Sequence, residues 1–147
     1  MNLKSYQAKR NFRKTIEPRG KLIRKNLSRF VVQEHQASRL HYDFRLELGG
    51  VLKSWAVPKG VPTESGIKRL AVAVEDHPVD YINFSGIIPK GEYGAGEVKI
   101  WDKGKWQMLD GSWERGSMKF NLAGKKLQGE YVLVRLKDKK NWLVYKV

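Results

Sequence analysis

Short runs of alternating apolar and polar residues follow one another along most of the chain from residue 28 onward. Such runs, separated by glycine and proline, are typical of β-strands. The pattern predicts strands over residues 29–35, 39–48, 51–57, 67–76, 97–109, 117–124, 129–138 and 141–147. Of these, 67–76 is expected to be a buried strand, and 97–109 to be two strands joined by a turn. Many short strands without a long amphipathic helix predict an all-β fold, a compact antiparallel barrel.

The segments between these runs predict turns and loops. Gly49-Gly50 indicates a hairpin, residues 58–66 a loop broken by two prolines, and residues 77–96 a loop-rich stretch. The first 27 residues show weak periodicity and indicate an extended basic arm with room for one short helix. We therefore expect a single domain, with an N-terminal arm over 1–27 and a barrel over 28–147.

The chain carries a strong and unevenly distributed positive charge. It holds 29 Lys and Arg against 15 Asp and Glu, a net charge of +14. Residues 1–29 contain ten of the basic residues and one acid, Glu17. A concentrated positive field attracts polyanions, of which nucleic acid is the commonest. A solvated basic tail that aids solubility or touches acidic membranes is the alternative.

Composition excludes several classes of site. The absence of cysteine rules out a disulfide framework, a thiolate zinc site and a cysteine nucleophile. No apolar run reaches membrane-spanning length, and the N-terminus lacks the apolar stretch of a signal peptide. We expect a soluble intracellular protein.

The segment 39–48 carries an unusual polar face. Alternate residues of a strand point to opposite sides, so one side presents Leu40, Tyr42, Phe44, Leu46 and Leu48. The other side presents His41, Asp43, Arg45 and Glu47. Imidazole and carboxylate groups bind divalent metals, and arginine offers a two-pronged fork to phosphate oxygens. His35 would complete a two-histidine, one-carboxylate set if the intervening connection folds back.

The spacing alone leaves three interpretations open for this strand. It fits a divalent-metal site that also binds phosphate, and it fits equally a salt-bridged outer face with incidental histidines. The same ligand set occurs in the facial triad of non-haem iron oxygenases.

A second group of polar residues lies between residues 69 and 81. It contains Arg69, Glu75, His77 and Tyr81. His77 follows a strand and precedes a proline, so we expect it where a strand leaves the barrel, a common place for functional residues. A structural histidine is the alternative. The segment "GEYGAGE" lacks the Lys-Ser or Lys-Thr of a phosphate-binding loop and indicates a turn between strands.

Several segments in this order resemble a known family. They are "RFVVQEHQASRLHYDFRLEL", "SWAVPKG", "VEDHPVDY" and "GIIPKGEYGAGEVKIWDKG". They resemble the 3′-phosphoesterase domain of the bacterial DNA repair ligase called ligase D and its stand-alone relatives, from "KRNFRKTIEP" to the final strands. The resemblance implies a β-barrel enzyme that uses Mn²⁺, or another divalent metal such as Zn²⁺ or Co²⁺. Such enzymes remove a terminal ribonucleoside to leave a 3′-phosphate, and then remove the phosphate to leave a 3′-hydroxyl.

The resemblance also implies roles for individual residues. By similarity His35, His41 and Asp43 would bind the metal. Arg45 and Arg69 would hold the scissile phosphate and His77 would contact it, while the pocket or its edge would include Lys59, Glu75 and Tyr81. Arg10 and Glu17 match polar residues that support the diesterase step. Asn11 stands where the family usually has an aspartate, so one negative charge is lost and an amide is kept.

The implied partners are the 3′ ends of DNA or RNA/DNA primer–templates. A separate ligase, a polymerase or a Ku-like end-binding protein are candidate protein partners, and the expected state is a cytoplasmic monomer that joins the nucleoid when bound to DNA. A non-catalytic nucleic-acid-binding barrel with structural histidines is the main alternative. A facial-triad oxygenase is less favoured, because the chain is basic and an arginine stands beside the triad.

The charge distribution makes a prediction about binding. Each neutralised phosphate of duplex DNA should steepen the fall of log K with log salt by about 0.9. We expect DNA affinity, measured by fluorescence anisotropy, to fall strongly between roughly 50 and 200 mM salt. An affinity that does not change over this range would contradict a phosphate-dominated interface.

Overall fold

The computed structural model describes residues 2–20 and 26–147, and these residues are mostly β-strands. In chain order the elements are α1 (Lys4–Ala8), β1 (Arg29–Gln36), β2 (Leu40–Leu48), β3 (Val51–Val57), β4 (Lys68–His77), the 3-10 turn η1 (Val79–Asn83), β5 (Gly86–Ile88), β6 (Gly96–Ser112), β7 (Ser117–Ala123), β8 (Gln128–Arg135) and β9 (Asn141–Lys146). No helix in the described ranges has the length and apolar character needed to cross a membrane.

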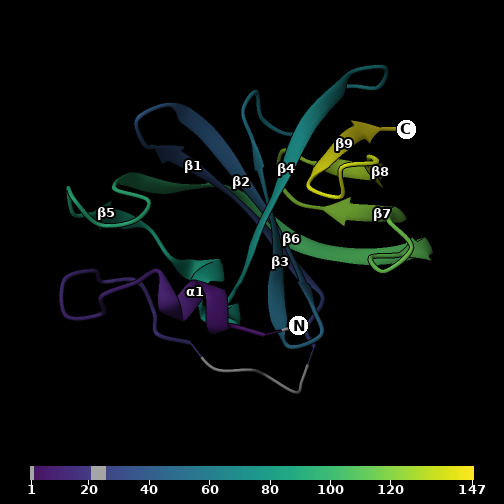
Figure 1. Cartoon of the computed structure of the whole chain (residues 1–147). Coiled ribbons are helices and arrows are strands. Elements are labelled where there is room, and N and C mark those ends of the chain that lie inside the picture. Colours follow the sequence, from purple (N-terminus) through teal and green to yellow (C-terminus); the bar gives the residue numbers. More distant parts are fainter. Residues whose placement is uncertain (1, 21–25) are drawn as a thin grey trace.

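Eight of the strands close into an antiparallel barrel (Figure 1). Neighbours run in the order β1, β2, β3, β4, β9, β8, β7 and β6, and β6 pairs back with β1 to close the ring. The short strand β5 pairs with the first residues of β6 and lies outside this ring. The expectation of an all-β antiparallel barrel is confirmed.

The barrel interior is filled by the apolar side of each alternating strand. Its buried cluster includes Phe30, Phe44, Trp55, Phe120 and Trp142. Aromatic rings meet across the interior, as where Trp55 and Trp142 lie edge to face with centroids 5.4 Å apart. The interior is therefore a packed core rather than a ligand cavity.

A second apolar cluster covers the outer face of the first strands. It joins residues of β1 and β3 to α1, η1, β5 and the start of β6 through Tyr6, Val31, Leu52, Tyr81, Ile82, Phe84, Ile88 and Val98. The short helix expected for the N-terminal arm is present as α1, and residues 2–20 pack against the barrel through contacts such as those of Tyr6 and Arg10. The remainder of that arm includes residues 21–25, which lie outside the described residues. Because of this cover, polar side chains on the outer face of β1 and β2 are buried.

Two strand predictions need correction. The run 97–109 is not two strands but part of one continuous strand, β6. Gly104 keeps an ordinary backbone conformation, and an added Cβ would collide with the Ala123 carbonyl. The missing side chain at Gly104 lets β7 approach β6 closely, and the chain makes no turn there. Asp102 accepts hydrogen bonds from the backbone amides of residues 125–127 in the β7–β8 connection.

Strand β4, expected to be buried, is mostly half-buried.

Gly96 is needed where β6 begins beside β1. Its φ is +132°, and an added Cβ would overlap the backbone oxygen of Gln36. Gly66 has a φ of +86° but open space around it. Substitutions at Gly96 and Gly66 can therefore separate the cost of backbone strain from the cost of a steric collision.

We predict that Gly96→Ala lowers the free energy of unfolding by about 2 kcal/mol or more, because strain and collision add. Gly66→Ala, the matched control, should lower the free energy of unfolding by less, since it introduces backbone strain without a collision. Urea unfolding followed by tryptophan fluorescence measures both. Equal losses in the two variants would contradict the close approach of β6 and β1.

Candidate active site

Three potential metal ligands meet near the turn of the β1–β2 hairpin. The antiparallel register places His35 directly opposite His41, and Asp43 follows His41 by two residues on the same face of β2. One ligand atom from each of the three lies within 4.8 Å of the others. The chain does fold back as the sequence interpretation required.

Hydrogen bonds leave one nitrogen of each imidazole facing Asp43. The Nε2 atom of His35 lies 2.7 Å from the Gly94 carbonyl, and Nδ1 of His41 lies 3.3 Å from the Arg39 carbonyl. A carbonyl can only accept, so each of these nitrogens carries a proton, and the other nitrogen of each ring is directed at Asp43. Metal-binding histidines are commonly oriented in this way. The donor set fits a divalent metal.

Asp43 is a buried carboxylate surrounded by positive or protonated partners. Its oxygens lie 3.4 Å from Nδ1 of His35, 3.2 Å from Nε2 of His41 and 3.4 Å from Nη2 of Arg45. Burial raises the pKa of Asp43, but the Arg45 charge and the histidine hydrogen bonds outweigh it and hold the pKa well below its usual range. The same contact with Asp43 raises the pKa of His41. A metal at this cluster therefore competes with a proton on His41.

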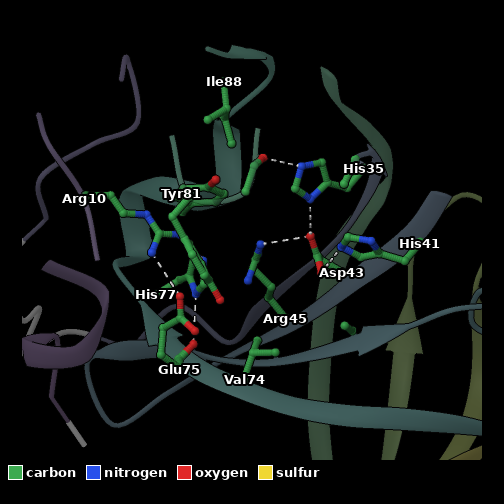
Figure 2. A pocket seen from close by; sticks show the side chains of 14 residues that line it. Arg10, His35, His41, Asp43, Arg45, Val74, Glu75, His77, Tyr81 and Ile88 are labelled. Atoms are coloured by element: carbon green, nitrogen blue, oxygen red, sulfur yellow. Dashed lines mark hydrogen bonds and ion pairs between the residues drawn. The ribbon is translucent and has the colours of Figure 1, made fainter. Parts of the chain in front are cut away.

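Arg45 occupies the centre of the site between two groups of side chains (Figure 2). Its Nε donates to Oε1 of Gln33 at 2.7 Å, and its guanidinium lies 4.8 Å from the centroid of the Tyr81 ring. Its Nη1 is buried and has no partner among the described residues. A buried N–H group normally has an acceptor, so this atom is suited to an anion.

On the other side of Arg45 lie Arg10, Glu75 and His77 (Figure 2). Nη1 of Arg10 donates to Oε1 of Glu75 at 3.0 Å, and Nη2 lies 3.4 Å from Nε2 of His77. The Arg10 side chain is almost fully buried. The N-terminal segment thus contributes a second guanidinium to a site that is otherwise built on the barrel.

His77 is held in its neutral form. Its Nδ1 lies 2.9 Å from the backbone oxygen of Glu75, which places the proton on Nδ1 and leaves Nε2 as an acceptor. Burial lowers the pKa of His77 well below its usual value, and the charges of Arg45 and Arg10 lower it further. In this state His77 can take up a proton but has none to give from Nε2.

Glu17 and Tyr81 form the base of the site. The Tyr81 hydroxyl donates to Glu17 at 2.6 Å, Thr15 donates to the other carboxylate oxygen at 2.9 Å, and Nε of Arg10 lies 3.3 Å from Glu17. Burial raises the pKa of the Tyr81 hydroxyl above its usual range. Tyr81 therefore presents its ring to Arg45 and His77, while its hydroxyl is engaged by Glu17.

These side chains line one pocket of about 340 Å³. Of the residues expected from the sequence it contains His35, His41, Asp43, Arg45, Arg10, Glu75, His77 and Tyr81. Glu17 lies beneath the pocket through its contacts with Arg10 and Tyr81. Members of both groups of polar residues found in the sequence therefore meet in this pocket, without Arg69 and Glu47.

Three expected residues lie elsewhere. Lys59 and Arg69 line a separate pocket of about 360 Å³ with Tyr42 and Trp101, and Arg69 donates to the Lys59 carbonyl at 2.8 Å. Asn11 is exposed, and its side-chain oxygen accepts from the Arg13 amide at 3.1 Å. None of the three lines the pocket that holds Arg45.

Other residues were not expected from the sequence. Gln33 is fully buried and connects Arg45 to the carbonyls of Tyr81 and Phe84. Its position two residues before His35 was the available signal. Tyr93 lines the pocket from the β5–β6 loop. Glu47, which had no role in the sequence interpretation, pairs with Arg29 at 3.0 Å.

Comparison with known proteins gives consistent matches. Residues 33–135 match the family described as the DNA ligase D 3′-phosphoesterase domain. The multifunctional non-homologous end joining protein LigD of Pseudomonas aeruginosa is 55% identical over 139 residues, which cover 90% of this chain and 16% of that protein. LigD proteins of Mycolicibacterium smegmatis and Mycobacterium tuberculosis are 46% and 43% identical, over 99% of this chain and 20% of theirs. The chain thus spans no more than a fifth of these relatives.

The low pKa of His77 has a consequence for stability. Below about pH 6.5 this histidine binds a proton in the unfolded chain but not in the folded chain. The free energy of unfolding therefore falls as the pH falls, by at most about 1.4 kcal/mol per pH unit. We predict that wild type loses roughly 1–2 kcal/mol more than His77→Gln between about pH 7 and pH 5. Urea unfolding in the presence of a chelator measures the difference. An identical pH dependence for both proteins would contradict a neutral buried His77.

Proposed function

The chain belongs to the DNA ligase D 3′-phosphoesterase domain family, and from this premise we propose that it is a divalent-metal-dependent phosphoesterase that processes 3′ ends. The proposed substrate is a DNA or RNA/DNA primer strand. The enzyme would remove a terminal ribonucleoside to leave a 3′-phosphate, and then the phosphate to leave a 3′-hydroxyl. A 3′-hydroxyl is the end that a ligase or polymerase can use, so a ligase, a polymerase or a Ku-like end-binding protein are proposed partners.

One observation carries this proposal. A two-histidine, one-carboxylate cluster and a buried arginine with an unpartnered Nη1 line the same pocket. A metal site alone would suit many reactions, and a buried arginine alone would suit any anion. Their convergence on one small volume suits a phosphate ester.

His35, His41 and Asp43 would hold the metal. When bound there, a divalent cation such as Mn²⁺, Zn²⁺ or Co²⁺ neutralises charge on a non-bridging phosphate oxygen. Asp43 is ionised and the three ligand atoms face one another, so a metal would bind by displacing the proton that His41 shares with Asp43.

The remaining residues act on the phosphate. Arg45 donates from Nη1 to a phosphate oxygen and is held in place by Gln33 and Asp43. Arg10 donates from the opposite side. These fixed guanidinium groups stabilise the charge of the transition state without having to reorganise.

The sequence favoured His77 as a donor of a hydrogen bond or proton to the departing oxygen. With the proton of its neutral ring on Nδ1, we propose instead that His77 accepts a proton on Nε2. Water adds to phosphorus opposite the departing oxygen, and one of its protons passes to Nε2 of His77. The bond between phosphorus and the departing oxygen breaks, and that oxygen takes a proton from solvent. The Nδ1 contact with Glu75 leaves Nε2 as the unprotonated nitrogen. Its lone pair faces Nη2 of Arg10 at 3.4 Å, and this long contact must open before Nε2 takes the proton.

We predict that His41→Ala and Asp43→Asn abolish release of phosphate from a primer with a 3′-phosphate. Each removes one proposed ligand, while the barrel interior lies on the other face of β2. Labelled primer–template incubated with Mn²⁺, Mg²⁺, Zn²⁺ or chelator measures this. Glu34→Gln is the matched control, because it makes the same carboxylate-to-amide change outside the pocket. Full activity in either ligand variant would contradict the metal assignment.

A second prediction concerns Arg45. Arg45→Ala should cost about 2–4 kcal/mol of transition-state stabilisation, a fall of roughly 10²–10³ in kcat, by analogy with loss of one preorganised donor to a developing negative charge. Arg135→Ala on β8 is the control, since Arg135 lies outside the pocket. Equal rates for the two variants would contradict a phosphate contact by Arg45. If wild type releases no phosphate with any metal, the alternative of a non-catalytic nucleic-acid-binding barrel takes its place.

A further inference from the structure

The proposed first step places a nucleoside on each side of the phosphate. In that step the phosphate joins two nucleosides, the last of which departs, so groups must be held on both sides of phosphorus. The pocket around Arg45, of about 340 Å³, holds the phosphate in this proposal. The departing nucleoside extends from it toward a neighbouring surface.

A second hollow of about 450 Å³ adjoins this pocket. The two share Val74, Glu75 and Tyr93 as lining residues. The second hollow is also lined by Lys9 and Lys140, and by Ser5 of α1. A nucleoside attached to the phosphate in the first pocket can therefore extend into the second across Tyr93 and Glu75.

Tyr93 stands at the boundary between the two hollows and is half exposed, at 50%. Nζ of Lys9 and Cζ of Arg10 each lie 4.9 Å from the centroid of its ring. The next residue, Gly94, receives the hydrogen bond from His35, so the loop that carries Tyr93 is attached to the proposed metal ligands. The ring is thus fixed relative to the reacting phosphate.

We propose that Tyr93 stacks on the base of the terminal nucleoside that is removed in the first step, with Lys9 beside it in the second hollow. Aromatic side chains in basic surroundings bind bases of either sugar type by stacking. In the first step water adds to phosphorus, the bond from phosphorus to the 5′ oxygen breaks, and the nucleoside leaves with a 5′-hydroxyl. The strand keeps the 3′-phosphate, and the second step has no terminal nucleoside for Tyr93 to bind.

This inference rests on the proposed function, but an experiment can refute the inference while the proposed function stands. The two steps can be measured apart, on a primer that ends in a ribonucleoside and on the same primer that ends in a 3′-phosphate. The useful quantity is the ratio of nucleoside removal to phosphate release, because a general loss of activity cancels in it. A variant that affects folding or metal binding lowers both rates and leaves the ratio unchanged.

We expect Tyr93→Ala to lower this ratio by about tenfold, a loss typical of one stacked base, with most of the change in KM for the ribonucleoside end. Tyr93→Phe keeps the ring and should retain the ratio within about twofold. Tyr145→Ala is the matched control, since Tyr145 also lies near a lysine, 5.3 Å from Nζ of Lys68, but lines neither hollow.

A Tyr93→Ala ratio equal to that of wild type would overturn the inference while the proposed function stood. A fall in the ratio for Tyr93→Phe as large as for Tyr93→Ala would also overturn it, because the hydroxyl and not the stacked ring would then be responsible. Absence of both activities in the metal-supplied wild type would instead refute the proposed function.

Discussion

The site depends on burial of the Asp43 carboxylate on the outer face of a closed barrel. Asp43 is 6% exposed and Arg45 is 3% exposed, and a buried charge costs several kcal/mol unless partners compensate it. The β1–β2 register supplies His35 and His41, and β2 itself supplies Arg45. The N-terminal segment, η1 and β5 contribute Arg10, Tyr81 and Ile88 to the same pocket, so segments that complete the outer apolar cluster also complete the site.

Charges in the pocket divide into two sets around Arg45. Asp43 and the two histidines form the side suited to a cation, while Arg10, Glu75 and His77 form the other side. Arg45 neutralises Asp43 and, together with burial and Arg10, keeps His77 neutral. One guanidinium thus favours the ionised Asp43 and the neutral His77 at the same time, and in the proposed function it also binds the phosphate. The Gly94 contact with His35 extends this arrangement to the β5–β6 loop.

Much of this architecture could be predicted from the sequence, because strand alternation is a local property. Alternation placed His41, Asp43 and Arg45 on one face, and the ordered motifs identified the family. It could not show that this face is buried, since that depends on a return of residues 2–20 to the barrel. The run 97–109 was interpreted as two strands joined by a turn, because the role of Gly104 in it, close approach of β7, depends on a non-local neighbour. The sequence also could not predict that Lys59 and Arg69 lie in a separate pocket. Which side chains share a pocket depends on how the barrel closes, and not on the order of motifs along the chain.

Direct measurement of Mn²⁺ binding is the sharpest test of the account, because it does not depend on substrate or on a chosen assay of activity. Calorimetric titration of metal-free wild type and of Asp43→Asn, at neutral pH and with unfolding monitored in parallel, gives stoichiometry and affinity. The account predicts one Mn²⁺ ion per chain for wild type, with proton release, and loss of this binding in the folded Asp43→Asn protein. Equal binding by the two proteins, or no binding by wild type, would contradict it.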